Sequence, residues 1–180
     1  MAASGADAVY FAGGSDRFVL GLFRRLSHMR PDLPLVTPDA FLGFFGPAQL
    51  AGRPLGMYTT GAFLVDPQNQ LPPEGRRFVR EFSATQPGRA INAFVPYAAQ
   101  ATEVLLDAIG RSDGSRASVI RELFATRVED GILGSFTFDA NGDITPATIP
   151  VFRIEQDPDS GGRVYRLFEV LEVPSELTAG

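Results

Sequence analysis

Two short apolar runs on either side of an amphipathic segment are the feature that most constrains the fold of this 180-residue chain. The first run, residues 8–12, closes on Gly13-Gly14 and predicts a buried strand, and residues 33–37 predict a second strand. Between them, apolar residues recur at helical spacing, at Phe18, Val19, Leu22, Phe23 and Leu26. Strand, helix and strand within about 30 residues form a βαβ unit, which requires a parallel sheet. We therefore predict an α/β fold whose parallel sheets carry helices on both faces.

The remaining elements follow from patterns of the same kind. A short helix is expected at residues 47–51, a third strand at 55–59, and longer helices at 74–85, 93–109 and 115–126. The tail predicts strands at residues 135–138, 148–154 and 164–173, with a hairpin loop at 157–162. The apolar residues expected to face inward on the last two helices are Ala98, Ala101, Val104, Leu105 and Ala108, and then Val119, Leu123 and Phe124.

Composition and charge restrict the class of function. The net charge is −5 and basic residues gather only in pairs such as Arg24-Arg25, so nucleic acid is not an expected partner. The absence of cysteine excludes disulfides, thiolate metal sites and cysteine nucleophiles. The single histidine, His28, is expected to be solvated near a helix C-terminus, and no G-x-S-x-G serine occurs, so we expect no enzyme, no catalytic residue and no cofactor.

The residues present are not expected to form a signal peptide or a membrane-spanning helix. The first seven residues have neither the basic start nor the apolar stretch of a signal peptide. No run reaches the roughly 18 apolar residues that a membrane-spanning helix needs.

Two strand ends carry candidate binding residues. Gly13-Gly14 precedes a helix, where it could bind an anion or simply form a tight turn, and the residues alone favour the turn. Asp39 follows the second strand and should share a sheet edge with Ser15. Its carboxylate could receive the ammonium group of a ligand or cap the next helix, and the residues alone favour the cap.

The segment from Asp139 to Asp143 imitates the start of a calcium loop. An EF-hand loop needs glycine at its sixth position and glutamate at its twelfth, but here Gly142 is fourth and Pro150 is twelfth. We therefore predict a turn between strands at Asn141-Gly142 and no metal site.

Taken in order, several stretches resemble one family. They are residues 6–14 (ADAVYFAGG), the LPLV strand with Asp39 after it, residues 50–58, residues 94–101 (FVPYAAQA) and residues 131–143 (GILGSFTFDANGD). This ordered set resembles the C-terminal part of the branched-chain amino acid type of solute-binding protein, which has a type I periplasmic binding fold. The resemblance runs across nearly the whole chain.

The resemblance implies a fragment of a two-lobed clamshell that closes on its ligand. Residues 1–62 and 151–180 would form part of the second lobe, and residues 63–150 part of the first lobe. The crossings between lobes would lie near residues 60–66 and near Pro150. The chain would begin midway through the second lobe, so its partners would include a missing N-terminal segment or a second copy of the chain.

The resemblance also implies site residues. Asp39 occupies the family's place for the acid that holds a ligand ammonium, which reverses the preference for a helix cap. Ser15 and Asn92 stand where the family often has aromatic residues, and Phe94 is close enough to Asn92 to substitute.

The implied function is binding of a small polar solute, an amino acid or related organic acid, for uptake through a membrane ABC permease. That role implies a periplasmic or extracellular, membrane-tethered protein. The alternative is a ligand-sensing module of the same fold attached to a transcriptional regulator or receptor, which would make it cytoplasmic or membrane-tethered. An α/β enzyme is a third, disfavoured possibility.

Overall fold

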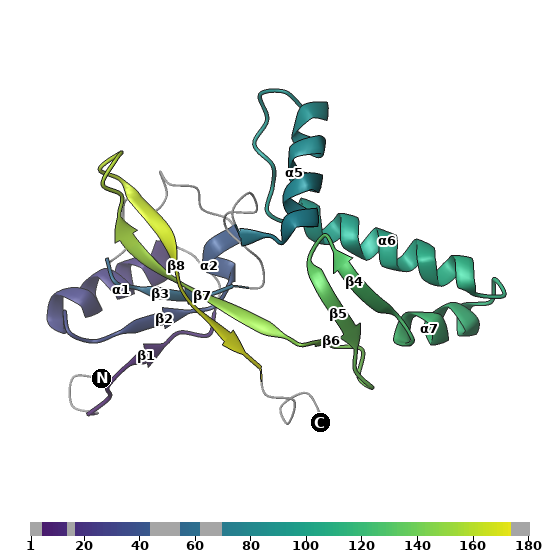
Figure 1. Ribbon diagram of the computed structural model, residues 1–180. Helices are drawn as coiled ribbons and strands as arrows, with labels where there is room; N and C mark the ends of the chain where they lie inside the picture. The colour runs from purple at the N-terminus through teal and green to yellow at the C-terminus, as the bar shows by residue number, and fades with distance from the viewer. Residues whose placement is uncertain (1–4, 14–16, 44–54, 62–69, 174–180) are drawn as a thin grey trace. The chain divides into compact units, whose positions relative to one another are not determined.

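The computed structural model describes residues 5–13, 17–43, 55–61 and 70–173. The chain forms two compact units (Figure 1). Unit 1 comprises residues 1–62 and 149–171, and unit 2 comprises residues 63–148 and 172–180. The helix expected at residues 47–51 lies outside the described residues.

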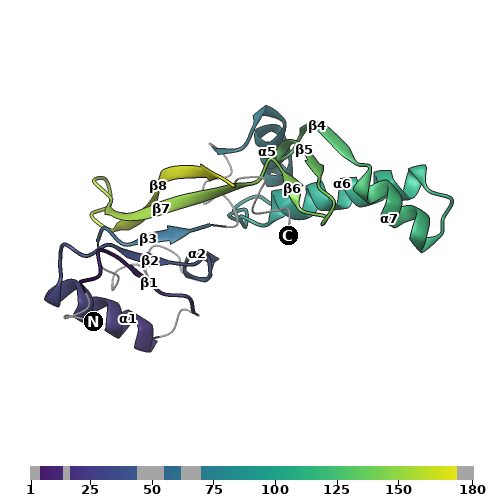
Figure 2. The same ribbon diagram turned by 90° about the horizontal axis from the view of Figure 1, so that it is seen from below.

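Unit 1 is built on a five-stranded sheet. In spatial order its strands are β1 (Val9–Tyr10), β2 (Leu35–Thr37), β3 (Tyr58–Thr60), β7 (Thr148–Gln156) and β8 (Arg163–Glu172). Figure 2 shows them one above another in this order. β1, β2 and β3 are parallel, as the βαβ pattern predicts, and β7 is antiparallel to β3.

One face of this sheet carries the hydrophobic core of unit 1. Helix α1 (Arg17–Met29) and the short helix α2 (Ala40–Gly43) pack there, because both contribute to one cluster with the strands. Its buried members are Val19, Phe23, Leu26, Leu35, Phe41, Met57 and Ile154. We call this side of the sheet the helix face.

The opposite side of the sheet is the open face. Strand register defines it: Tyr10 is paired with Val36, Val36 with Tyr58, and Tyr58 with Arg153, so these four side chains share one face. Phe168 of β8 joins them through a ring contact with Tyr58 at 5.0 Å. Tyr10 is 60% exposed, so the prediction that the first strand is buried was wrong.

Unit 2 combines a three-stranded antiparallel sheet with three described helices. Its strands are β4 (Arg127–Gly131), β5 (Gly134–Phe138) and β6 (Ile144–Thr145), and its helices are α5 (Pro73–Thr85), α6 (Val95–Arg111) and α7 (Arg116–Phe124). The helix predictions are confirmed to within two residues at each end. β4 and β6 were not predicted, since neither has a clear apolar alternation.

The expected inward faces of α6 and α7 need correction. α6 buries the row Pro96, Gln100, Val104 and Ala108, spaced four residues apart. Ala98, Ala101 and Leu105 are exposed, and Phe124 of α7 is 46% exposed. The helices in contact with α6 are α7 and α5, and only this one row of α6 is buried within unit 2. Polar Gln100 belongs to that row because its Oε1 accepts a hydrogen bond from the Leu133 N–H at 3.2 Å.

Candidate functional site

The carboxyl ends of the three parallel strands of unit 1 meet at one edge of the sheet. Asp39 lies at this edge, two residues after β2 ends at Thr37, and it is exposed. In open α/β sheets, ligands bind outside the carboxyl ends of the strands. An exposed carboxylate at this edge can accept a charge-assisted hydrogen bond from a cationic ligand group.

Side chains of β3 and β8 hold the turn that carries Asp39. The Thr59 hydroxyl of β3 donates to the Pro38 carbonyl at 2.9 Å. The Asp39 carbonyl accepts from the Leu42 N–H at 2.7 Å, and the Tyr165 hydroxyl of β8 donates to the Phe41 carbonyl at 2.7 Å. The backbone on both sides of Asp39 is thus fixed from β3 and β8.

Thr59 and Tyr165 were missed as positioning residues by sequence reasoning. Thr59 is fully buried. The sequence does not reveal which carbonyl accepts a hydrogen bond from the hydroxyl of a threonine in a strand. Tyr165 is 124 residues away from Phe41 in the chain, so only the folded sheet brings the two together.

The other predicted site residues divide between the units. Ser15 lies outside the described residues. Asn92 and Phe94 belong to unit 2, at the start of α6, where the Asn92 Oδ1 accepts from the Phe94 N–H at 2.9 Å and the Asn92 carbonyl accepts from the Val95 N–H at 3.0 Å. Asn92 therefore stabilises the backbone at the start of α6. Phe94 is 53% exposed.

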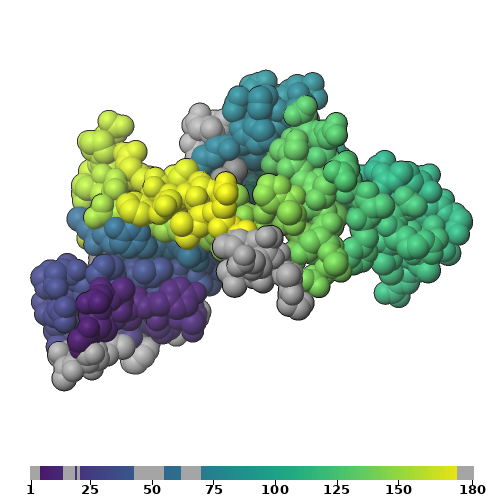
Figure 3. Space-filling model, turned by 60° about the horizontal axis from the view of Figure 1, so that its bottom comes forward, coloured from purple at the N-terminus to yellow at the C-terminus, as the bar shows by residue number. Residues whose placement is uncertain are grey.

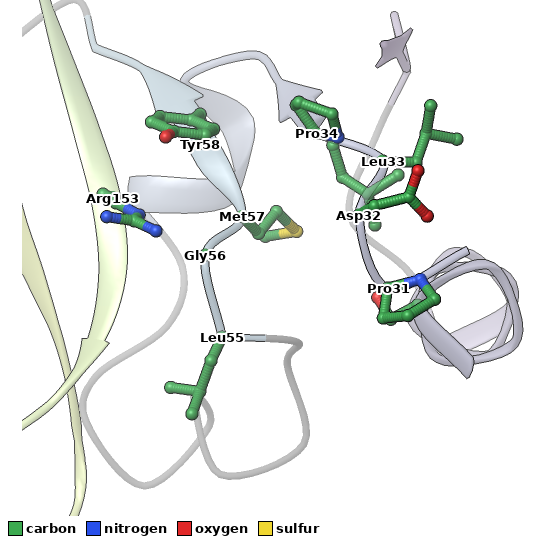
Figure 4. A pocket seen from close by; sticks show the side chains of 11 residues that line it. Pro31, Asp32, Leu33, Pro34, Leu55, Gly56, Met57, Tyr58 and Arg153 are labelled. Carbon is green, nitrogen blue, oxygen red and sulfur yellow. The ribbon is translucent and has the colours of Figure 1, made fainter. Parts of the chain in front are cut away.

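A hollow of about 530 Å³ lies at the amino end of β2 and β3, opposite the edge that carries Asp39 (Figure 4). Its lining is Ser27, Pro31 to Leu35, Leu55 to Tyr58, and Arg153. The Arg153 guanidinium carbon lies 5.6 Å from the centre of the Tyr58 ring, and among the described residues its buried Nε has no hydrogen-bond partner. Asp32 hydrogen-bonds to Arg30, which lowers the pKa of the Asp32 carboxyl. Because the hollow lies at the amino end of β2 and β3 and Asp39 lies at their carboxyl end, the hollow is separate from the predicted site.

The remaining chemical candidates are structural. The Asp139 carboxylate accepts from the backbone N–H groups of Asn141 at 2.8 Å and Asp143 at 2.9 Å, which confirms a turn between β5 and β6. His28 is exposed in the last turn of α1, as expected. Within the described ranges no group of three metal-ligating side chains occurs.

Of the helices described, none has the length and apolar character to cross a membrane.

Solved structures share the fold of both units. A leucine-binding protein from Thermotoga maritima is 21% identical, with a TM-score of 0.65 over 94% of this chain and 45% of its own. An ABC transporter substrate-binding protein from Sphaerobacter thermophilus is 23% identical, with a TM-score of 0.64 over 95% of this chain and 46% of its own. This chain has a periplasmic binding protein fold. A solute-binding protein from Rhodopseudomonas palustris, crystallised with p-hydroxybenzoic acid, is 16% identical, with a TM-score of 0.67 over 94% of this chain and 46% of its own.

This chain spans about half the length of the solved structures that it matches. No family model matches its sequence, and no curated protein sequence does. The α/β class and the type I periplasmic binding fold predicted from the sequence are confirmed.

Proposed function

We propose that this chain is part of a solute-binding protein that captures a small organic acid outside the cytoplasm and delivers it to an ABC transporter. The single observation that carries the proposal is the fold match, which extends over 94% of the chain and so includes both units. Unit 1 would belong to the second lobe of such a protein and unit 2 to the first lobe. Ligand binding would shift an equilibrium between open and closed arrangements of the lobes.

The ligand chemistry follows from Asp39. Among the matched proteins one is named for leucine and another was crystallised with p-hydroxybenzoic acid. Both molecules carry a carboxyl group, but only leucine carries an amine. Asp39 supports an amine-bearing ligand because its exposed carboxylate sits at the carboxyl edge on a turn braced by Thr59. An amino acid or related amino-bearing acid is therefore the proposed ligand class.

The other proposed contacts are less specific. Ser15, which follows β1 in the sequence, is proposed as a hydroxyl contact. Phe94 is proposed as an aromatic contact, and Asn92 would hold the backbone of Phe94 through their 2.9 Å hydrogen bond. No catalytic residue is proposed.

The test is calorimetry on the full native gene product with a panel of amino acids and with p-hydroxybenzoate. Asp39→Asn should weaken an amino acid by about ten- to a hundredfold, because a charge-assisted contact contributes about 1.5–3 kcal/mol. The same substitution should change p-hydroxybenzoate binding much less, since that ligand has no amine.

Asp159→Asn is the matched control, because Asp159 is exposed in the loop between β7 and β8. It should leave affinity unchanged. If the Asp39→Asn variant bound every amino acid as tightly as the wild type, Asp39 would not be a ligand residue. It would then be only a helix cap, a role that asparagine fills about as well as aspartate.

A further inference from the structure

The hollow at the amino end of β2 and β3 has the size of a binding site. Its volume of about 530 Å³ lies within the range of about 300–1,000 Å³ that small-molecule sites in proteins occupy. All of its lining residues belong to unit 1, so one unit forms the whole hollow. Asp39 lies at the other end of the strands and takes no part in it.

The cation in the hollow is Arg153 of β7, and packing holds its side chain in place. The guanidinium carbon lies 5.6 Å from the centre of the Tyr58 ring, and a Cβ atom at Gly56 would lie 3.6 Å from the Arg153 Nη2. Gly56 has a φ of 75°, a conformation that favours glycine. Glycine at this position therefore keeps a side chain away from the guanidinium. Figure 4 shows the guanidinium directed from β7 towards Gly56 and Met57.

Arg153 has binding capacity that the described residues do not use. Its Nη1 lies 3.9 Å from a Glu155 carboxylate oxygen, which is too far for a hydrogen bond, and that carboxylate also lies 3.4 Å from Arg166. Arg166 belongs to β8, the yellow strand that reaches the visible surface of unit 1 in Figure 3. Two cations thus share one carboxylate, which leaves one positive charge in excess. A guanidinium with free N–H groups can bind an oxyanion through charge-assisted hydrogen bonds.

Apolar side chains line the hollow beside Arg153. Met57 is buried at its floor and Leu55 is 52% exposed at its rim (Figure 4). Asp32 also lines the hollow, but Arg30 binds both of its carboxylate oxygens, at 3.3 and 3.1 Å, so its charge is compensated. The hollow therefore combines an uncompensated cation with an apolar wall.

We infer that this hollow is a second binding site, for a monocarboxylate with an apolar body. The carboxylate binds the Arg153 guanidinium, and the apolar body packs on Leu55 and Met57. A neutral analogue would lose the charge-assisted contact, and an inorganic anion would lose the apolar contact. The inference goes beyond the proposed function, because this site lies at the opposite end of the strands from Asp39 and takes a ligand without an amine.

Methionine methyl NMR on the full native gene product gives a local readout. Met57 lines the hollow, whereas Met29 is 63% exposed on α1 and does not line it. Phenylacetate should shift the Met57 methyl signal and leave the Met29 signal unchanged, and Met57→Leu identifies the signal. Phenylacetamide, which lacks the charge, and inorganic phosphate, which lacks the apolar body, should each bind weaker by about tenfold or more.

Two substitutions test the residues of the site. Arg153→Gln should weaken phenylacetate binding by about tenfold or more, because no cation remains to bind the carboxylate. Leu55→Glu should weaken it as well, because it adds a negative charge at an exposed position of the lining without removing a core side chain. Arg25→Gln is the matched control: it removes the same charge from an exposed position of α1 outside the lining, so affinity should stay unchanged.

A Met57 signal that phenylacetate leaves unchanged up to millimolar concentration would overturn the inference. Wild-type affinity in both Arg153→Gln and Leu55→Glu would overturn it too, and so would equal binding of phenylacetamide or phosphate. The titration is repeated with the amino acid panel at saturation. Persistence of the Met57 shift supports a separate site, and loss of the shift would place phenylacetate at the Asp39 edge instead. A protein that binds phenylacetate at Met57 but binds no amino acid would refute only the proposed function.

Discussion

At the residue scale, two buried threonines decide how the candidate edge is held. Thr37 and Thr59 are paired across β2 and β3, and both are fully buried on the helix face. Their hydroxyls are satisfied by backbone carbonyls, Thr37 by Tyr58 at 3.2 Å and Thr59 by Pro38 at 2.9 Å. Only the second of these bonds reaches the turn that carries Asp39.

Thr59→Val should therefore lower the free energy of unfolding by about 0.5–1.5 kcal/mol, because the Pro38 carbonyl loses the Thr59 hydroxyl and keeps only the Phe41 N–H as a donor, while side-chain volume is kept. In the native protein it should also weaken ligand binding. Thr37→Val is the control: urea unfolding should show a similar loss of stability, but calorimetry should show unchanged affinity. Weaker binding by both variants would mean that Thr59 does not position Asp39 specifically.

The Asp139 turn gives a second prediction at this scale. One carboxylate oxygen of Asp139 already accepts two backbone N–H groups, so the carboxylate is engaged in the turn. Micromolar calcium or zinc should leave the melting temperature unchanged. A metal-dependent rise in melting temperature would show that the turn is a binding site after all.

At the element scale, a glycine in α5 and a glycine in α6 differ in the space that a side chain would have. A Cβ atom at Gly75 of α5 would meet the Ile132 carbonyl oxygen and lie 2.9 Å from the Leu71 Cβ. A Cβ atom at Gly110 of α6 would meet nothing within 4 Å. The glycine at position 75 is what lets α5 approach the turn between β4 and β5.

Gly75→Ala should consequently destabilise the protein by roughly 1–3 kcal/mol through overpacking. Gly110→Ala should stabilise it by about 0.5–1 kcal/mol, because alanine is the better helix former and the site is open. Chemical unfolding of the two variants checks the signs. Stabilisation by both would mean that α5 does not approach the β4–β5 turn closely.

At the scale of the whole molecule, both units leave large apolar side chains exposed among the described residues. Besides the open face, α6 exposes Leu105, Leu106 and Ile109, at 44%, 62% and 45%. Contiguous apolar surface of this kind is typical of a binding interface.

The isolated 180-residue chain should therefore bind an apolar fluorescent dye or self-associate in light scattering. Leu105→Gln with Leu106→Gln should reduce dye binding with little change in melting temperature, since both side chains are already exposed. Val104→Gln, next to them but buried, should unfold the protein. A monodisperse monomer without dye binding would contradict this prediction.

Much of the fold could be predicted from the sequence. Hydrophobic periodicity is local, so the βαβ unit, the long helices and the β-like tail could be identified, and the order of motifs indicated the binding-protein fold. The same local rules placed Asp39 at a strand end.

Only the tertiary structure decided which surfaces are buried and what holds Asp39. Hydrophobic periodicity cannot show how much of the surface of a helix its neighbours cover, so Ala98 and Leu105 of α6 were expected in the core but lie exposed. Strand alternation cannot show which face lacks a cover, so Tyr10 was expected to be buried. The bonds from Thr59 and Tyr165 join residues 21 and 124 positions apart, and only the packed sheet brings such distant groups within hydrogen-bonding reach.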